Sequence, residues 1–194
     1  FKLNEQSMVL LCPTKLAYSE CCRIITNARR RAIKGQYELS EWDLKSIKYC
    51  LCVWLPSGHE SKDIQWGNFL QKHFKERLFL GVKRWLRANE EDYLQTCQFI
   101  AKQLNITIIA TSAACMHDPS RLPLQQCLQA IEQGKTVKSL GRDAHANAEA
   151  CLRSLSKLRQ LFPAQWLENA SRLAQQCQFN LSELAYEYPA EVVG

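Results

Sequence analysis

The sequence lacks any apolar run of about 18 residues or more, the length a transmembrane helix needs. Its first residues, Phe1 to Ser7, do not show the charged-then-apolar layout of a signal peptide. Low-complexity tracts and internal repeats are also missing. Hydrophobic residues make up 46% and charged residues 23% of the 194, a globular composition that fits one domain. We therefore expect a cytoplasmic protein without membrane contact.

The spacing of the ten cysteines does not suit a zinc site. Cys21 and Cys22 are adjacent, and Cys50 and Cys52 are one residue apart, whereas a zinc knuckle has a gap of two residues. We expect free thiols rather than disulfides, because a free cysteine on an apolar helix stripe behaves as a small hydrophobe. The cysteines predicted to lie buried on such stripes are Cys22, Cys97, Cys127 and Cys177.

The charge balance is mildly basic, with 25 Lys and Arg against 19 Asp and Glu. A net charge of +6 permits contact with nucleic acid but does not establish it. The candidate phosphate-contacting side chains gather at the end of a predicted helix, and are Arg29, Arg30, Arg31 and Lys34. The alternative interpretation is a solvated basic helix end, stabilised by the helix dipole.

Short apolar runs alternate with helical patterns, which indicates an α/β fold. The predicted strands cover residues 8–12, 50–55, 77–85 and 106–111, and the predicted helices cover residues 16–33, 69–74, 89–104, 124–133, 148–161 and 163–177. Between these elements, Ser40 is predicted to cap a short helix, and residues 56–66 read as an exposed loop. Residues 76–111 should form a strand–helix–strand unit with parallel strands.

Two of the predicted helices carry specific expectations. Asn89, followed by three acidic residues, should cap its helix through a side-chain acceptor. A leucine stripe in the helix over 148–161 should belong to the core rather than to a cofactor site, and consists of Leu152, Leu155, Leu158 and Leu161.

The segment from Thr111 to Pro119 is the candidate site, because it directly follows a strand, where barrel enzymes place catalytic groups. Ala113 cannot bind a metal, and Cys115 with His117 supplies too few ligands for a closed zinc site. A thiolate–imidazolium pair formed by Cys115 and His117 remains an alternative. His145 lies in a polar loop, where an exposed side chain without a role is expected.

Residues 110–117 read Ala-Thr-Ser-Ala-Ala-Cys-Met-His. This run resembles Ala-Thr-Gly-Asp-Val-His-Met-His in the polymerase and histidinol phosphatase (PHP) domains of bacterial error-prone DNA polymerases, enzymes of the DNA polymerase III alpha-subunit type. Ala113 falls where the family has a metal-binding aspartate, and Cys115 where it has a metal-binding histidine. Met116 and His117 match. By this resemblance, two metal-ligand positions are lost.

The resemblance continues on both sides of this motif. Residues 22–26 are similar to the family's Leu-Cys-Arg-Leu-Ile-Thr helix, and residues 121–134 to the segment after the motif. Residues 147–154 resemble Asn-Ala-Glu-Arg-His-Leu-Arg-Ser, with the Arg-His pair replaced by Ala150 and Cys151. Residues 162–191 resemble the boundary with the polymerase core. The similarity thus spans nearly the whole chain.

The resemblance implies part of a distorted β/α barrel of the PHP type with a helical C-terminal portion. Residues 1–145 would hold the later strands and helices of the barrel. Residues 146–194 would lead to the polymerase core within the same structural domain. The family's first metal-ligand segments would precede Phe1, and the catalytic aspartates of the polymerase would follow Gly194. We therefore expect the chain to be a fragment of a DNA-directed DNA polymerase.

The function implied is that of a non-catalytic structural scaffold in DNA synthesis or lesion bypass, without a bound metal or other cofactor. Its partners would be the remainder of the polymerase chain, DNA through that parent protein, and possible further copies of the fragment. The alternative is a PHP phosphoesterase or proofreading 3′–5′ exonuclease that uses a divalent metal. A standalone binding module is a weaker third hypothesis.

Overall fold

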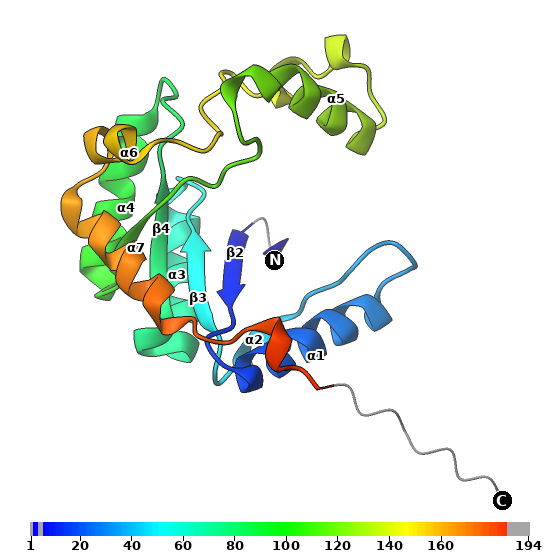
Figure 1. Ribbon diagram of the computed structural model, residues 1–194, viewed down its shortest axis with the longest axis vertical. Helices are drawn as coiled ribbons and strands as arrows, with labels where there is room; N and C mark the ends of the chain where they lie inside the picture. Colours follow the sequence, from blue (N-terminus) through cyan, green and yellow to red (C-terminus); the bar gives the residue numbers. More distant parts are fainter. Residues whose placement is uncertain (1, 4–5, 186–194) are drawn as a thin grey trace, which may run out of the picture.

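A computed structural model describes residues 2–3 and 6–185 as an α/β structure (Figure 1). The strands are β1 (Lys2–Leu3), β2 (Gln6–Leu11), β3 (Leu51–Leu55), β4 (Leu78–Lys83) and β5 (Thr107–Thr111). The α-helices are α1 (Lys15–Arg31), α2 (Glu41–Lys45), α3 (Glu60–Phe74), α4 (Glu90–Leu104), α5 (Leu122–Glu132), α6 (Leu155–Leu161) and α7 (Ala164–Gln176). Short 3-10 turns are η1 (Lys75–Arg77), η2 (Pro119–Arg121), η3 (Val137–Ser139), η4 (Gly141–Asp143) and η5 (Leu181–Glu183).

The strands form one mixed sheet in the order β1-β2-β3-β4-β5. β1 pairs antiparallel with β2, and β2 antiparallel with β3. The remaining pairs are parallel, with Trp54 opposite Leu80 and Gly81 opposite Ile109. The predicted parallel unit β4–α4–β5 is therefore confirmed, and β3–α3–β4 repeats the same arrangement.

The two faces of the sheet are covered differently. On one face, Met8, Trp54 and Leu80 pack with residues of α1, α3 and α4 in the main core. On the other face, Leu173 of α7 packs with Leu51, Val53 and Ile109. Figure 1 shows α3 behind the sheet and α7 in front of it, beside β5. The strand β2 is less covered on the α7 face, where Val9 is 44% exposed.

The short helix α2 begins as predicted at Ser40. The Ser40 hydroxyl accepts from the Asp43 amide, and the Asp43 carboxylate accepts from the Ser40 amide, so the two side chains form a capping box. In α1, the buried Glu20 carboxylate accepts hydrogen bonds from the backbone N–H groups of Lys48, Tyr49 and Cys50. This carboxylate ties the chain just before β3 to α1.

The prediction of an exposed loop over residues 56–66 was wrong for most of its length, because α3 already begins at Glu60. The Asp63 side chain is fully buried and accepts from Gln6 Nε2 (3.0 Å), from the Ser57 amide and hydroxyl (3.1 and 2.8 Å), and from the Gly58 amide (2.8 Å). Gln6 in turn accepts from Trp54 Nε1 (3.0 Å). Asp63, which belongs to the polar stretch 56–66, therefore forms a buried hydrogen-bond network that joins β2, β3 and α3.

The helix predicted over residues 148–161 was also wrong in its first half, since α6 begins only at Leu155, capped by Ser154. The preceding residues are not helical, because Cys151 forms a parallel β-bridge with Met116 instead. The predicted leucine stripe is correspondingly broken. Leu152 and Leu155 are 61% and 70% exposed, whereas Leu158 and Leu161 pack against the main core.

All ten cysteines are free thiols, as predicted, but their burial differs from the prediction. Cys97 is buried and Cys177 half-buried, whereas Cys22 and Cys127 are exposed.

The prediction that Asn89 caps its helix was only partly right, because Asn89 precedes α4 but its side chain makes no capping hydrogen bond.

We predict that Asp63→Ala lowers the free energy of unfolding by about 3 kcal/mol, since it removes the acceptor for four donors, several of them buried. Urea denaturation followed by circular dichroism would measure the loss. The matched control is Glu60→Ala, an exposed acid in the first turn of the same helix. It should cost less than about 1 kcal/mol, through the helix dipole alone. Equal losses in the two variants would contradict the role given to Asp63.

Candidate functional site

The carboxyl ends of β3, β4 and β5 lie along one edge of the sheet, because these strands run parallel. Three segments leave the sheet there, residues 56–58, 84–88 and 112–116. Ligand and catalytic groups of α/β proteins gather at such an edge. The segment after β5 that the sequence singled out therefore lies at this edge together with two further segments.

The segment after β5 turns sharply at Ala113. Its φ is 42°, in the left-handed region that non-glycine residues seldom adopt, and its amide donates to Thr111 Oγ1 (3.3 Å). The chain then pairs with a distant segment, as the amides of Cys115 and Met116 donate to the Ala150 carbonyl, and the Leu152 amide donates to the Met116 carbonyl. This pairing brings residues 113–117 beside residues 147–152.

The two paired segments enclose a small apolar cluster. Met116, Ala150 and Cys151 are buried, and Trp85 and Leu122 pack against them. Ala150 and Cys151 occupy the positions where the resemblance placed a changed Arg-His pair. The structure thus brings these two positions together with Met116, next to the candidate site.

The potential ligands Cys115 and His117 are both exposed. The Cys115 thiol donates to the Ala113 carbonyl (3.8 Å), and within the described residues no hydrogen bond joins it to His117. Across the described part of the chain, no group of three or more His, Cys, Asp or Glu side chains is arranged to hold a metal ion. The pair therefore shows no preformed thiolate–imidazolium geometry.

The segment after β4 is held rigidly in spite of an unfavourable backbone. Leu86 has a φ of 50°. The Glu90 carboxylate accepts from the Leu86 amide (2.6 Å) and from Arg84 Nε (2.9 Å). Asn147 Nδ2 donates to the Trp85 carbonyl (2.7 Å), and Trp85 Nε1 donates to the Ser112 carbonyl (3.0 Å). These bonds fix this turn to both of the neighbouring segments.

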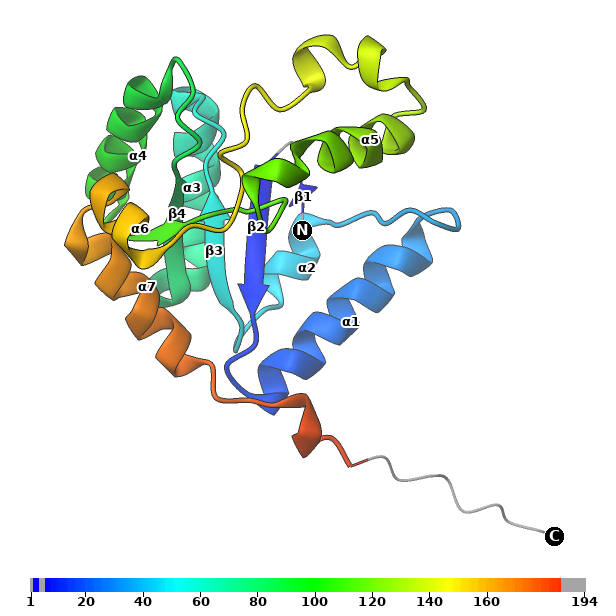
Figure 2. The same ribbon diagram turned by 45° about the horizontal axis from the view of Figure 1, so that its top comes forward.

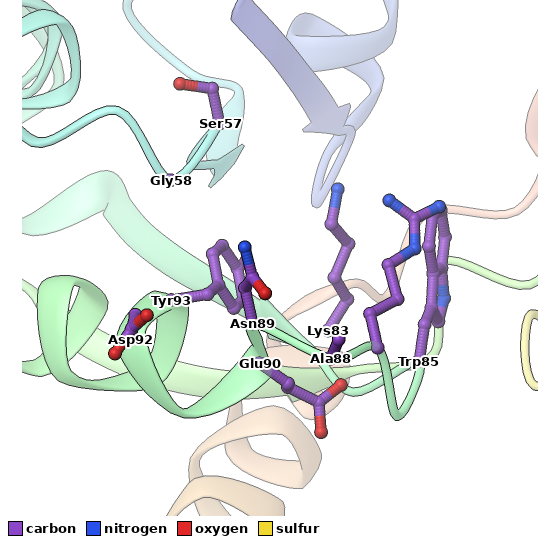
Figure 3. A pocket seen from close by; sticks show the side chains of 10 residues that line it. Ser57, Gly58, Lys83, Trp85, Ala88, Asn89, Glu90, Asp92 and Tyr93 are labelled. Carbon is purple, nitrogen blue, oxygen red and sulfur yellow. The ribbon is translucent and has the colours of Figure 1, made fainter. Parts of the chain in front are cut away.

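A recess of about 580 Å³ opens beside this turn. It is lined by Ser57, Gly58, Lys83, Trp85, Arg87, Ala88, Asn89, Glu90, Asp92 and Tyr93 (Figure 3). Lys83 Nζ and Arg87 Cζ each lie 4.7 Å from the centroid of the Trp85 ring. Burial, and secondarily the positive charge of Arg87, lower the pKa of Lys83. Sequence reasoning missed this recess, although Lys-Arg-Trp-Leu-Arg after a buried strand was a usable signal.

His145 is not the fully exposed side chain that the sequence predicted. It is half-buried, and its ring packs against that of Trp85 in a T-shaped arrangement, with a centroid separation of 5.9 Å and an interplanar angle of 68°. Its pKa is lowered by burial and then by the charge of Arg87. The neutral imidazole is therefore favoured beside the basic turn.

The basic group at the end of α1 lies apart from this edge, at the far end of α1 in both views (Figures 1 and 2). Arg31 donates to both oxygens of Asp43 (2.8 and 2.6 Å) and to the Glu38 carbonyl (2.8 Å). Its guanidinium thus has a structural partner. Arg29, Arg30 and Lys34 are exposed, and their contact with phosphate stays a prediction.

Comparison with known proteins finds relatives named error-prone DNA polymerase. The chain is 52% identical over 194 residues to the error-prone DNA polymerase of Vibrio vulnificus (strain CMCP6) and 44% identical to that of Vibrio campbellii. It is 35% identical to the error-prone DNA polymerase of Teredinibacter turnerae. Each match covers 100% of this chain but only 19% of the relative's length. No protein-family model matches the sequence.

We predict that Ala113→Gly stabilises the fold by about 1 kcal/mol, because glycine adopts a positive φ without the clash of a Cβ atom. Thermal and urea unfolding would measure the gain. The matched control is Ala114→Gly, at the next, exposed position, where φ is not positive. Here the more flexible unfolded chain should make the variant slightly less stable. A loss of stability at both positions would show that the turn at Ala113 is unstrained.

Proposed function

We propose that this chain is a PHP-type portion of a longer, cytoplasmic error-prone DNA polymerase and acts in it as a non-catalytic structural scaffold. Relatives named error-prone DNA polymerase, which match the chain from end to end, support the polymerase assignment. The observation that carries the scaffold role is the apolar cluster of Met116, Ala150 and Cys151 beside the former ligand positions.

The physical argument concerns what a divalent cation needs from its surroundings. Such an ion is held by several oxygen, nitrogen or thiolate ligands, and those ligands are oriented by polar groups around them. Ala113 and Ala150 offer no donor atom, and Met116 offers only a weakly ligating thioether. Cys151 is 4% exposed and packs among apolar side chains, so its sulfur is closed off from a metal ion at the surface of this edge. At this edge of the sheet, these side chains therefore pack against one another instead of binding a metal ion.

A scaffold also needs a surface on which the rest of the protein can rest, and α5 offers one. Its apolar stripe of Leu124, Leu128 and Ile131 is 53%, 54% and 75% exposed. Figures 1 and 2 show α5 standing away from the sheet. Exposed apolar stripes at helical spacing are typical of surfaces that another part of a protein covers. We propose that the remainder of the polymerase chain covers this stripe, and that DNA is engaged through the polymerase as a whole.

We predict that a Cys115→Ala/His117→Ala double variant of the intact protein extends a DNA primer at a rate within about twofold of the unchanged protein. The reason is that neither side chain belongs to the scaffold's packing. Primer extension and hydrolysis of a 3′-labelled strand would be measured side by side, with and without added Mn²⁺ or Zn²⁺. Metal analysis after gel filtration should detect no tightly held transition metal in either protein.

A second variant probes the scaffold itself. Leu124→Asp/Leu128→Asp should reduce primer extension severalfold if the α5 stripe is covered, because a buried charge opposes docking. If the chain is instead a metal-dependent phosphoesterase or exonuclease, the Cys115/His117 double variant should lose that hydrolytic activity. A metal-dependent exonuclease or phosphatase activity that is lost in the Cys115/His117 double variant would replace the scaffold proposal with the phosphoesterase.

A further inference from the structure

The recess beside β4 carries two cations that form no ion pair with any acid among the described residues. Of the three cationic side chains at the end of β4, Arg84 has partners in the Glu90 carboxylate (2.9 Å) and the Leu161 carbonyl (2.7 Å). Lys83 and Arg87 have neither an ion pair nor a hydrogen bond to a carboxylate among residues 6–185. Both instead lie over the Trp85 ring. The local positive charge is therefore left open toward the recess.

The acids that line the recess do not change this. Figure 3 shows the Lys83 side chain extending into the recess, between Trp85 on one side and Asn89 with Tyr93 on the other. The Glu90 carboxylate points away from Lys83 and is engaged by Arg84 and by the Leu86 amide. Asp92 lies on the far side of Tyr93 and is exposed to solvent. The part of the recess nearest Lys83 is thus positively charged.

Keeping two cations here is unfavourable for the folded chain alone. Lys83 is half-buried and lies beside the same aromatic ring as Arg87, so like charges are brought together in a partly desolvated place. The turn that carries them also holds Leu86 at a positive φ, against its intrinsic preference. Uncompensated charge and backbone strain that occur together are typical of a binding site, where a ligand supplies the missing interaction.

We propose that this recess binds, without a metal ion, a phosphate group of a nucleotide or of single-stranded DNA. Lys83 would act as a point charge, and the guanidinium of Arg87 would donate two parallel hydrogen bonds to the phosphate oxygens. The Asn89 amide, which makes no capping bond, would be a third donor. A volume of about 580 Å³ exceeds that of a lone inorganic anion and suits a nucleotide-sized group. The site goes beyond the scaffold function and does not depend on it.

The site can be tested in the intact protein by chemical labelling of Lys83. The aldehyde of pyridoxal 5′-phosphate condenses with a deprotonated lysine amine, releasing water, and borohydride reduces the imine to a stable secondary amine. Peptide mass mapping then reports each lysine separately, so other DNA-binding surfaces do not interfere. Pyridoxal, which lacks the phosphate, is the matched reagent. Lys102, exposed on the last turn of α4, is the matched lysine.

We expect the ratio of labelling by pyridoxal 5′-phosphate to labelling by pyridoxal to be about tenfold higher at Lys83 than at Lys102, because the phosphate anchors the reagent. Arg87→Gln should reduce the ratio at Lys83 toward that at Lys102. Equal ratios at the two lysines, or an unchanged ratio in Arg87→Gln, would overturn the proposal.

Protection by ligands identifies the source of the phosphate. Inorganic phosphate and deoxythymidine 5′-monophosphate should slow labelling of Lys83, whereas sodium chloride at the same ionic strength should not. Protection by oligothymidylate only when it carries a 5′-phosphate would assign the site to a terminal phosphate. Protection by the unphosphorylated oligomer as well would assign it to the DNA backbone. Equal protection by chloride would show general screening and would refute a built phosphate site.

Discussion

The order of the parallel strands determines most of what this molecule can do. Because β3, β4 and β5 follow one another in sequence and in space, both connecting helices lie on the same face of the sheet, where α3 and α4 pack together. The strand ends, and the loops that follow them, consequently gather at one edge. The opposite face is left to α7, which packs mainly on β5 and leaves Val9 of β2 largely exposed.

Two carboxylates turn that edge into a defined shape. Asp63 holds the loop after β3 through Ser57 and Gly58, and Glu90 holds the turn after β4 through Arg84 and Leu86. Each carboxylate accepts hydrogen bonds from N–H or O–H groups of the protein itself. Such bonds replace the water that a partly buried acid loses. Both acids spend their hydrogen bonds on these loops and, within the described residues, form no ion pair with Lys83 or Arg87, although Asp63 still attracts Lys83 through space. The hydrogen bonds that fix the loops therefore also leave the two cations without a direct acidic partner.

The parts of this fold that the sequence predicted are those set by local pattern. The β-branched run at residues 106–111 predicted β5, and Ser40 predicted the start of α2. The parallel β4–α4–β5 unit followed from the alternation of elements. Local patterns gave wrong predictions where contacts with residues distant in the sequence determine the structure. Residues 148–152 have a helical pattern, but their pairing with Met116 keeps them out of a helix. Asp63 looks like a loop residue until Gln6 and the turn after β3 surround it.

The candidate site shows the same division. Its position after β5 could be predicted, since a strand end at a parallel edge is a common place for function. The pairing of this segment with residues 147–152 was not predicted, because no local rule connects residues 35 positions apart, such as Cys151 and Met116. The recess was missed for a related reason. Lys83 and Arg87 become a pair only when Leu86 adopts a positive φ and both cations reach the Trp85 ring.

The scarcity of negative charge and the presence of cations at this edge of the sheet are physically related. A divalent metal site needs a surplus of negative charge, since the carboxylates around it must outweigh the repulsion of nearby cations. A metal-independent phosphate site needs the reverse, cations without acids. At this edge Ala113 and Ala150 provide no negative charge and Glu90 is already paired, whereas Lys83 and Arg87 form no ion pair within the part of the chain that the structure describes. Each of these features disfavours a bound metal, and together they favour a bound phosphate at the same edge of the sheet.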